Sequence, residues 1–305
     1  MRTLSLIGMV GVALLVACDS EQHYVGLTEP IIAQHAELKK GDLPSHDEGV
    51  RVTSFQLNFG VITPGAPNLK VSGRVTDDTY GVAFRIAELG TGYWLKPAGA
   101  PDPSVPGELT FEFVFSASPN IAPGNHTFVA AAFDENGRAG PEYEVPVCVV
   151  SDLPDNQNAC DPSNEPPAAI VSLTWHADAD VDLSIEAPDG NTYDRVNRSV
   201  FNEDGSVSFG LQFDGSTGCA VDGKRRENFV WNDAPEQGGT WLVYANLFDA
   251  CHHPAVGFEA TVYRRKRNGD GTYRLDADEP VRGEFLRVQQ NGGVGTPLYL
   301  TAIEF

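Results

Sequence analysis

Three aspartates occupy every second position of one predicted strand: Asp178, Asp180 and Asp182. Because successive side chains of an extended strand point to opposite faces, the three carboxylates share one face at steps of about 7 Å. Carboxylates in such a row repel one another unless positive charge neutralises them, and calcium prefers oxygen ligands. The spacing therefore predicts a calcium site on this face, with Asp189 or Asn191 of the following turn as further ligands.

The same carboxylates have two other interpretations. Asp178 and Asp180 could lie in solvent at the start of the strand, while Asp182 accepts hydrogen bonds from the backbone or from an arginine. Alternatively, Asp178 and Asp182 could be the catalytic acid and base of an enzyme that hydrolyses glycan or peptide. Two carboxylates can serve as acid and base when their environments give them different pKa values. The chain has no Gly-x-Ser-x-Gly elbow, zinc-protease helix motif or phosphate loop, so the sequence favours a non-catalytic protein.

The start of the chain has the pattern of a signal peptide: Arg2, an apolar run over residues 4–16, and the small Ala17. The run is too short for a membrane span, which needs about 20 apolar residues. The segment Leu15-Val16-Ala17-Cys18 resembles the lipobox of bacterial lipoproteins. This resemblance implies cleavage before Cys18, acylation of that cysteine with chains such as palmitate, and a lipid-anchored protein of the cell envelope outside the cytoplasm.

The cysteine count agrees with export. With Cys18 set aside for lipid, Cys148, Cys160, Cys219 and Cys251 remain, an even number that can pair in three ways. We favour Cys148 with Cys160 and Cys219 with Cys251, because each pair then closes a loop within one predicted domain or at its border. Such disulfides belong to an oxidising compartment.

Composition points to an acidic all-β protein. Acidic residues outnumber basic ones by 42 to 21, giving a net charge of -21, so nucleic acid is excluded as a partner because its binding depends on basic residues. The 31 glycines and 21 prolines, with frequent Asn-Gly and Asp-Gly steps, predict many turns between short strands. A length of 305 residues predicts about two domains.

The chain divides into five predicted segments. After the signal peptide (1–17), residues 18–49 are mostly polar and are expected to form a tether. Residues 50–150 alternate as six or seven strands and predict an immunoglobulin-like β-sandwich, and their turn at 132–140 resembles that of bacterial immunoglobulin-like and fibronectin-like modules. Residues 151–167, rich in Asp, Asn and Pro, are the expected linker to a second domain, 168–305.

The second domain carries a more specific set of motifs. They are Leu173-Thr174-Trp175, Asp180-Val181-Asp182-Leu183, Pro188-Asp189-Gly190, Glu227-Asn228-Phe229-Val230-Trp231 and Gly239-Thr240-Trp241-Leu242-Val243-Tyr244-Ala245. These segments resemble the YfaP-like family of bacterial extracytoplasmic domains. The resemblance implies a jelly-roll-type β-sandwich without established catalytic activity. Ser184 stands where a histidine is common in that family, which weakens a metal role at that position.

Basic and metal-binding residue types form three further clusters. Lys224-Arg225-Arg226 and Arg264-Arg265-Lys266-Arg267 are either solvated positions, the second beside a predicted hairpin turn at 268–271, or a contact to anionic headgroups or acidic glycans. Cys251-His252-His253 offers zinc or copper ligands, but adjacent strand residues face opposite ways and Cys251 is better used in a disulfide.

Aromatic side chains could build a carbohydrate-stacking platform, and the residues considered are Trp94, Trp175, Trp231, Trp241, Tyr244 and Tyr299. Trp175, Trp231 and Trp241 lie inside alternating strands, which predicts core positions. Trp94, in a glycine-rich segment, is the best candidate for an exposed ring.

These observations together predict a lipid-anchored envelope protein with two β-sandwiches, acting as a non-catalytic binding or structural module with calcium as a candidate stabilising ion. The expected partners are the membrane, through the lipid, and an envelope protein or glycan. An accessory subunit that binds a partner protein through the edge strands of its sandwiches is a further alternative.

Overall fold

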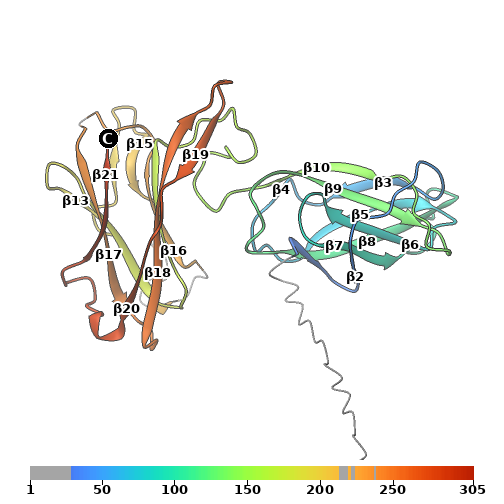
Figure 1. The fold of residues 1–305 in the computed structure, drawn as a ribbon, viewed down its shortest axis with the longest axis horizontal. Helices are drawn as coiled ribbons and strands as arrows, with labels where there is room; N and C mark the ends of the chain where they lie inside the picture. Colours follow the sequence, from blue (N-terminus) through green and yellow to red (C-terminus); the bar gives the residue numbers. More distant parts are fainter. Residues whose placement is uncertain (1–28, 213–218, 221–223, 237) are drawn as a thin grey trace, which may run out of the picture.

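The computed structural model describes residues 29–212, 219–220, 224–236 and 238–305, and within these ranges the chain is built from β-strands without an α-helix (Figure 1). The strands form two β-sandwiches, which confirms the predicted fold class. No helical segment of the described ranges has the length and apolar character that a membrane crossing requires. Cys18 and the predicted signal peptide lie outside the described residues.

The first sandwich packs a four-stranded sheet against a six-stranded one. The smaller sheet runs in the order β1 (Ile31–Ala33), β8 (Glu108–Ala117), β5 (Leu69–Thr76), β3 (Val52–Leu57). The larger runs in the order β2 (Glu37–Lys40), β7 (Gly92–Pro97), β6 (Gly81–Ile86), β9 (Gly124–Phe133), β10 (Tyr143–Val149), β4 (Val61–Ile62). All of these pairs are antiparallel except β10 with β4, which is parallel.

Phenylalanine rings fill the space between these two sheets. Phe113 and Phe115 of β8 are fully buried, as the alternation along residues 109–115 predicts, and Phe84 of β6 lies with its ring centroid 4.3 Å from that of Phe113. Phe128 of β9 is fully buried in the same cluster. Rings from both sheets therefore interlock in one core, and their burial supplies the main driving force for this domain.

The predicted tether is wrong for residues 29–49, which belong to the first sandwich. Strand β1 pairs with β8, strand β2 pairs with β7, and Ile31 is only 1% exposed. Glu29 is buried too, and its carboxylate accepts hydrogen bonds from the backbone and hydroxyl of Thr91. The physical reason is that both strands sit at sheet edges, where three or four residues suffice to pair and no long apolar run is needed.

The second sandwich packs a seven-stranded sheet against a four-stranded one. The larger sheet runs in the order β14 (Ser199–Phe201), β15 (Val207–Leu211), β16 (Arg226–Trp231), β11 (Ala169–Trp175), β18 (Ala255–Arg267), β19 (Tyr273–Ala277), with β20 (Val281–Leu286) also pairing with β18. The smaller runs in the order β13 (Thr192–Tyr193), β12 (Asp180–Glu186), β17 (Thr240–Asp249), β21 (Leu298–Glu304). A short 3-10 helix, η2 (Arg287–Gln289), follows β20.

Strands β12 and β17 divide their side chains strictly between the core and the outer face of the smaller sheet. The inward positions Val181, Leu183 and Ile185 of β12, like Val243, Ala245 and Leu247 of β17, belong to the buried core cluster. The alternate positions must therefore point to the outer face. In register, Asp182 lies opposite Asn246 and Ser184 opposite Tyr244.

Residues 151–167, the segment predicted to be a linker, run between the two sandwiches and are held at both ends. On the first sandwich, the disulfide from Cys148 of β10 reaches Cys160, whose carbonyl accepts a hydrogen bond from the Asn125 side chain. On the second, the Asn158 amide donates to the carbonyl of Tyr273 at 3.0 Å, and Arg265 donates to the carbonyl of Pro166 at 3.2 Å. Specific contacts with each sandwich therefore hold residues 151–167 in place.

Candidate functional site

A polar pocket of about 440 Å³ lies on the outer face of the smaller sheet of the second sandwich. Its floor consists of the outward positions of β12 and β17, and its walls are the segment after β13 and the segment before β21. The lining residues are Asp182, Ser184, Glu186, Thr192, Asp194, Arg195, Tyr244, Asn246, Gly293, Gly295, Thr296 and Pro297. Asp182 of the predicted calcium ligands and Tyr244 of the aromatic candidates are among them.

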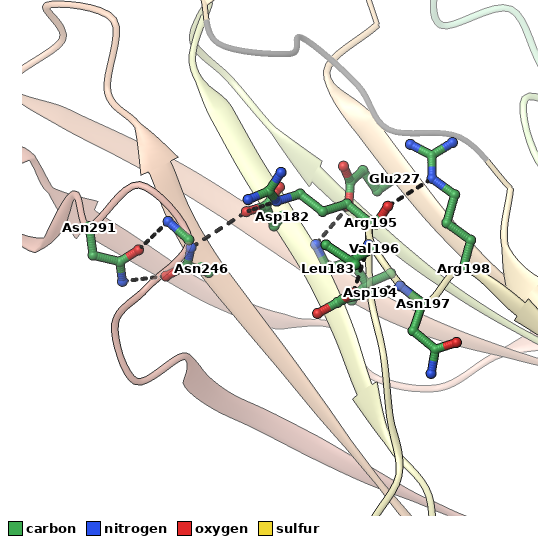
Figure 2. Close-up of polar contacts among 11 residues, drawn as sticks. Asp182, Leu183, Asp194, Arg195, Val196, Asn197, Arg198, Glu227, Asn246 and Asn291 are labelled. Atoms are coloured by element: carbon green, nitrogen blue, oxygen red, sulfur yellow. Dashed lines mark hydrogen bonds and ion pairs between the residues drawn. The ribbon is translucent and has the colours of Figure 1, made fainter.

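Asp182 is held in a chain of polar contacts across the pocket floor (Figure 2). Its Oδ2 lies 3.5 Å from the Asn246 amide nitrogen and 3.9 Å from Nε of Arg195. The Asn246 carbonyl oxygen in turn accepts a hydrogen bond from the amide of Asn291, whose own oxygen accepts from the backbone of Gly293. Residues far apart in sequence therefore fix one another around Asp182, a residue that is only 7% exposed.

The wall after β13 is organised by its own hydrogen bonds. Asp194 accepts from the backbone N–H groups of Val196 and Asn197 at 2.7 and 3.0 Å, in the manner of an Asx turn. The guanidinium of Arg195 lies 4.8 Å from the ring centroid of Phe248, a cation–π contact. Figure 2 shows Arg195 reaching from this turn toward Asp182, so the turn positions a donor over the pocket floor.

A second polar pair completes the floor. The Tyr244 hydroxyl donates to Glu186 at 3.0 Å, and the ring of Tyr244 meets that of Tyr299 edge to face, 5.8 Å between centroids. Burial, and next the hydrogen bond to Glu186, raise the pKa of Tyr244 above its ordinary value. Tyr244 therefore remains a neutral hydroxyl that can also accept a hydrogen bond.

Glu227 lies beneath this face but belongs to the core. It is 1% exposed, and its carboxylate accepts a hydrogen bond of 2.6 Å from the backbone N–H of Leu183, which joins β16 to β12 across the sandwich. Asn228 and Trp231 of the same motif are fully buried. The motif that carries part of the family resemblance is thus structural.

The structure does not gather the four aspartates predicted to hold calcium. Asp178 is half-buried and ion-paired with Arg225, whose Nε donates to it at 2.8 Å. Asp180 is buried at an irregularity in the pairing of β12 with β17, and Asp189 accepts hydrogen bonds from Asn191 in its own turn. Arginine supplies the positive charge next to Asp178 and Asp182, where the sequence suggested a cation.

Among the described residues, the group of Cys, His, Asp or Glu side chains close enough together to hold a metal ion consists of Cys219, Asp249 and Cys251. The two cysteines form a disulfide, so their sulfurs are not thiolate ligands. This also removes Cys251 from the Cys251-His252-His253 cluster. Both cysteine pairings favoured from the sequence, Cys148–Cys160 and Cys219–Cys251, are present.

The basic clusters are matched by acidic side chains. Arg264 pairs with Asp278, Arg265 with Glu165, Lys266 with Asp276, and Arg226 with Asp152. The run at 264–267 ends β18 in the predicted hairpin with β19. These ion pairs agree with the interpretation of the clusters as solvated surface positions. They also leave less unpaired positive charge that could bind anionic headgroups.

The prediction for Trp94 is wrong, because this ring is 6% exposed and its Nε1 donates a hydrogen bond of 3.1 Å to the carbonyl of Ile31. Strand β1, which the sequence placed in the tether, covers it. Trp175, Trp231 and Trp241 are buried, as predicted. Of the aromatic candidates, Tyr299 is the well-exposed ring, at 53%.

Sequence reasoning named Asp182 and Tyr244 as members of two separate candidate sites and missed the other residues that line the pocket. The alternation that placed Asp182 and Ser184 on one face extends to Glu186, and the same pattern along β17 gives Tyr244 and Asn246. That periodic signal could have identified the floor. No comparable pattern exists for Arg195, which comes from an irregular turn.

Comparisons with known proteins show no matching family model and no matching curated protein. Among solved structures, the chain is similar to dimeric latent PorU from Porphyromonas gingivalis, with 12% identity, a TM-score of 0.23, and coverage of 76% of this chain and 20% of that chain. It is also similar to fibronectin(III)-like modules of Clostridium thermocellum CbhA, with 13% identity, a TM-score of 0.19, and coverage of 80% and 97%.

A third similarity is to the C-terminal domain of the AgI/II polypeptide BspA from Streptococcus agalactiae, with 13% identity, a TM-score of 0.21, and coverage of 79% and 99%. The chain spans a fifth of the length of PorU, the first of these structures. All three similarities are too distant to indicate a ligand or an activity.

Proposed function

We propose that this protein is an exported, lipid-anchored protein of the bacterial cell envelope that acts as a non-catalytic binding module. Export is supported by the two disulfides, which belong to oxidising compartments. Because those bonds use four of the five cysteines, Cys18 remains for the acylation that its lipobox-like context implies. The second sandwich, with its YfaP-like motifs, is the binding domain, and the first is a spacer.

The pocket on the outer face of β12 and β17 is the observation that carries the binding role. Its polar groups are held by one another before any ligand arrives, through Asp182 with Asn246 and through Glu186 with Tyr244. Preorganised groups favour binding because little entropy is lost when a ligand docks.

A hydrolase that uses Asp178 and Asp182 has weaker support. Asp178 is ion-paired with Arg225 and is not among the residues that line the pocket, whereas Asp182 is. An acid and a base must both reach the same scissile bond. The two carboxylates therefore do not form the pair that this mechanism requires.

Strand β21 favours a second candidate function, that of an accessory subunit. It is an edge strand of the smaller sheet, and Leu298 and Tyr299 at its start are 43% and 53% exposed. An open edge with exposed apolar side chains can accept a strand from a partner protein.

Metabolic labelling with a palmitate analogue, combined with a pull-down from detergent-solubilised envelopes, tests the proposal. We expect label on the wild-type chain and none on Cys18→Ala. We also expect a captured partner that the pocket variant Glu186→Gln retains less well than the surface variant Glu284→Gln. An unlabelled wild-type chain contradicts the anchor, and capture that is equal for both variants contradicts the pocket.

A further inference from the structure

We infer that the pocket on the outer face of β12 and β17 binds an uncharged oligosaccharide. This inference rests on the binding role proposed above and names its ligand class. The first reason is the chemistry of the lining. Apart from Gly293, Gly295 and Pro297, every lining residue carries a hydroxyl, an amide, a carboxylate or a guanidinium. Such a lining disfavours a wholly apolar ligand, since the polar groups would lose water without gaining partners.

Donors and acceptors alternate across the floor in the way that sugar hydroxyls require. Arg195 and Asn246 offer N–H donors, Asp182 and Glu186 offer acceptors, and Tyr244 offers a hydroxyl. A sugar hydroxyl both donates and accepts, so neighbouring hydroxyls of one ring can engage a carboxylate and an adjacent amide together. Because Asp182 lies directly opposite Asn246 in the strand register, this acceptor and donor are neighbours.

Charge decides which sugars fit. The lining holds the carboxylates of Asp182, Glu186 and Asp194 against the single guanidinium of Arg195, an excess of two negative charges. The whole chain carries a net charge of -21, which adds to this field. Uronic acids and phosphorylated or sulfated sugars are therefore repelled, and uncharged sugars are not.

Aromatic surface beside the polar floor supplies the remaining element of a sugar site. Tyr244 lines the pocket, and Tyr299, its edge-to-face neighbour, is 53% exposed. The C–H face of a pyranose ring packs against aromatic rings, which gives apolar contact without an apolar cavity. The cavity of about 440 Å³ lies in the range that small-molecule sites occupy.

A peptide is disfavoured at this position. Strands β12 and β17 are the two central strands of their sheet. Strand β17 is paired along both edges, with β12 and with β21, whereas β12 is paired with β17 and, at Ile185 and Glu186, with β13. The pocket is lined by the outward side chains of these strands, so a peptide lying in it would bind through side-chain contacts and not as an added strand.

Calorimetric titration of the full chain in detergent with cellotriose, maltotriose, N-acetylchitotriose and trigalacturonate tests the inference. We expect at least one of the three uncharged trisaccharides to bind and trigalacturonate not to bind. Glu186→Gln and Asn246→Ala should each weaken that binding about tenfold, because each removes one hydrogen-bond partner of the ligand. The exposed Glu284→Gln, on β20 of the other sheet, is the matched control and should bind as the wild type does.

Three outcomes overturn the inference: no uncharged trisaccharide binds, trigalacturonate binds as well as they do, or the pocket variants bind like Glu284→Gln. Equal thermal midpoints for Glu186→Gln and Glu284→Gln show that a loss of binding is not a loss of fold. If no sugar binds but the envelope pull-down still captures a protein in a manner that depends on Glu186, the sugar inference fails and the binding module stands. If both experiments are negative, both fail.

Discussion

The hydroxyl of Tyr244 donates a hydrogen bond to Oε2 of Glu186 across 3.0 Å, and both side chains face the same pocket. Burial is the main cause that raises the pKa of Tyr244, and the hydrogen bond to Glu186 and the charge of that carboxylate raise it further. The pair thus keeps a neutral hydroxyl next to a charged acceptor.

Substitution Glu186→Gln should lower the pKa of Tyr244, because it removes the negative charge that disfavours tyrosinate. Because the pKa of Tyr244 is higher in the folded state than in the unfolded state, its protonated hydroxyl stabilises the fold. This contribution is complete at a pH below the pKa of unfolded tyrosine, and it is lost as the pH rises through the pKa of Tyr244 in the folded protein. The stability advantage of the wild type over Glu186→Gln should therefore shrink in alkaline solution. Ultraviolet titration against Tyr244→Phe isolates this hydroxyl, and an unchanged midpoint in Glu186→Gln contradicts the prediction.

Glu227→Ala should lower the free energy of unfolding by about 3 kcal/mol, because it leaves the N–H of Leu183 without its carboxylate partner and opens a cavity. Urea denaturation measures the change. The exposed Glu284→Ala is the control and should stay within about 0.5 kcal/mol of the wild type. Equal midpoints for the two variants would show that the buried hydrogen bond does not stabilise the sandwich.

Two neighbouring isoleucines test whether the segment before residue 50 belongs to the first sandwich. Ile31 is 1% exposed and Ile32 is 40% exposed. We expect Ile31→Ala to cost about 2–4 kcal/mol of unfolding free energy, and Ile32→Ala less than about 1 kcal/mol. A tether would tolerate both substitutions equally, so identical denaturation curves would restore that interpretation.

The disulfide between Cys148 and Cys160 should protect the connection between the sandwiches from proteases. In the double variant Cys148→Ser with Cys160→Ser, we expect faster cleavage within residues 149–160, because local opening exposes backbone to the protease. The double variant Cys219→Ser with Cys251→Ser removes the other disulfide and should leave this segment protected. Limited proteolysis with mass spectrometry reads out the cleavage sites, and equal rates in both variants would count against the prediction.

Removal of divalent cations tests the calcium hypothesis directly. Arg225 pairs with Asp178, and Arg195 lies 3.9 Å from Asp182, so both carboxylates already have positive charge beside them. We therefore expect a chelator to leave the thermal midpoint unchanged. A lower midpoint that calcium restores and magnesium does not would instead establish a calcium site in this domain.

The sandwiches could be predicted because apolar side chains alternate along their strands. A period-two pattern such as Phe111, Phe113 and Phe115 indicates a strand with one face buried in the core. The edge strands β1 and β2 escaped prediction since their few residues carry almost no periodic signal. In the pocket, Asp182 was identified from its strand, but its partner Arg195, and Asn291 that donates to its other partner Asn246, lie on irregular segments. Their proximity depends on tertiary packing, which local sequence does not encode.

The bond between Cys148 and Cys160 also determines how tension would travel along the chain. The covalent path of a pull on the second sandwich enters the first through the sulfur atoms of Cys160 and Cys148 and bypasses the backbone of residues 149–159. Cys148 stands on β10 between Asn125 of β9 and Val61 of β4. Force along β10 would shear both ladders at once, which requires many hydrogen bonds to break together. A force directed along β10 would thus be shared between the β9 and β4 ladders at the point where the second sandwich is attached.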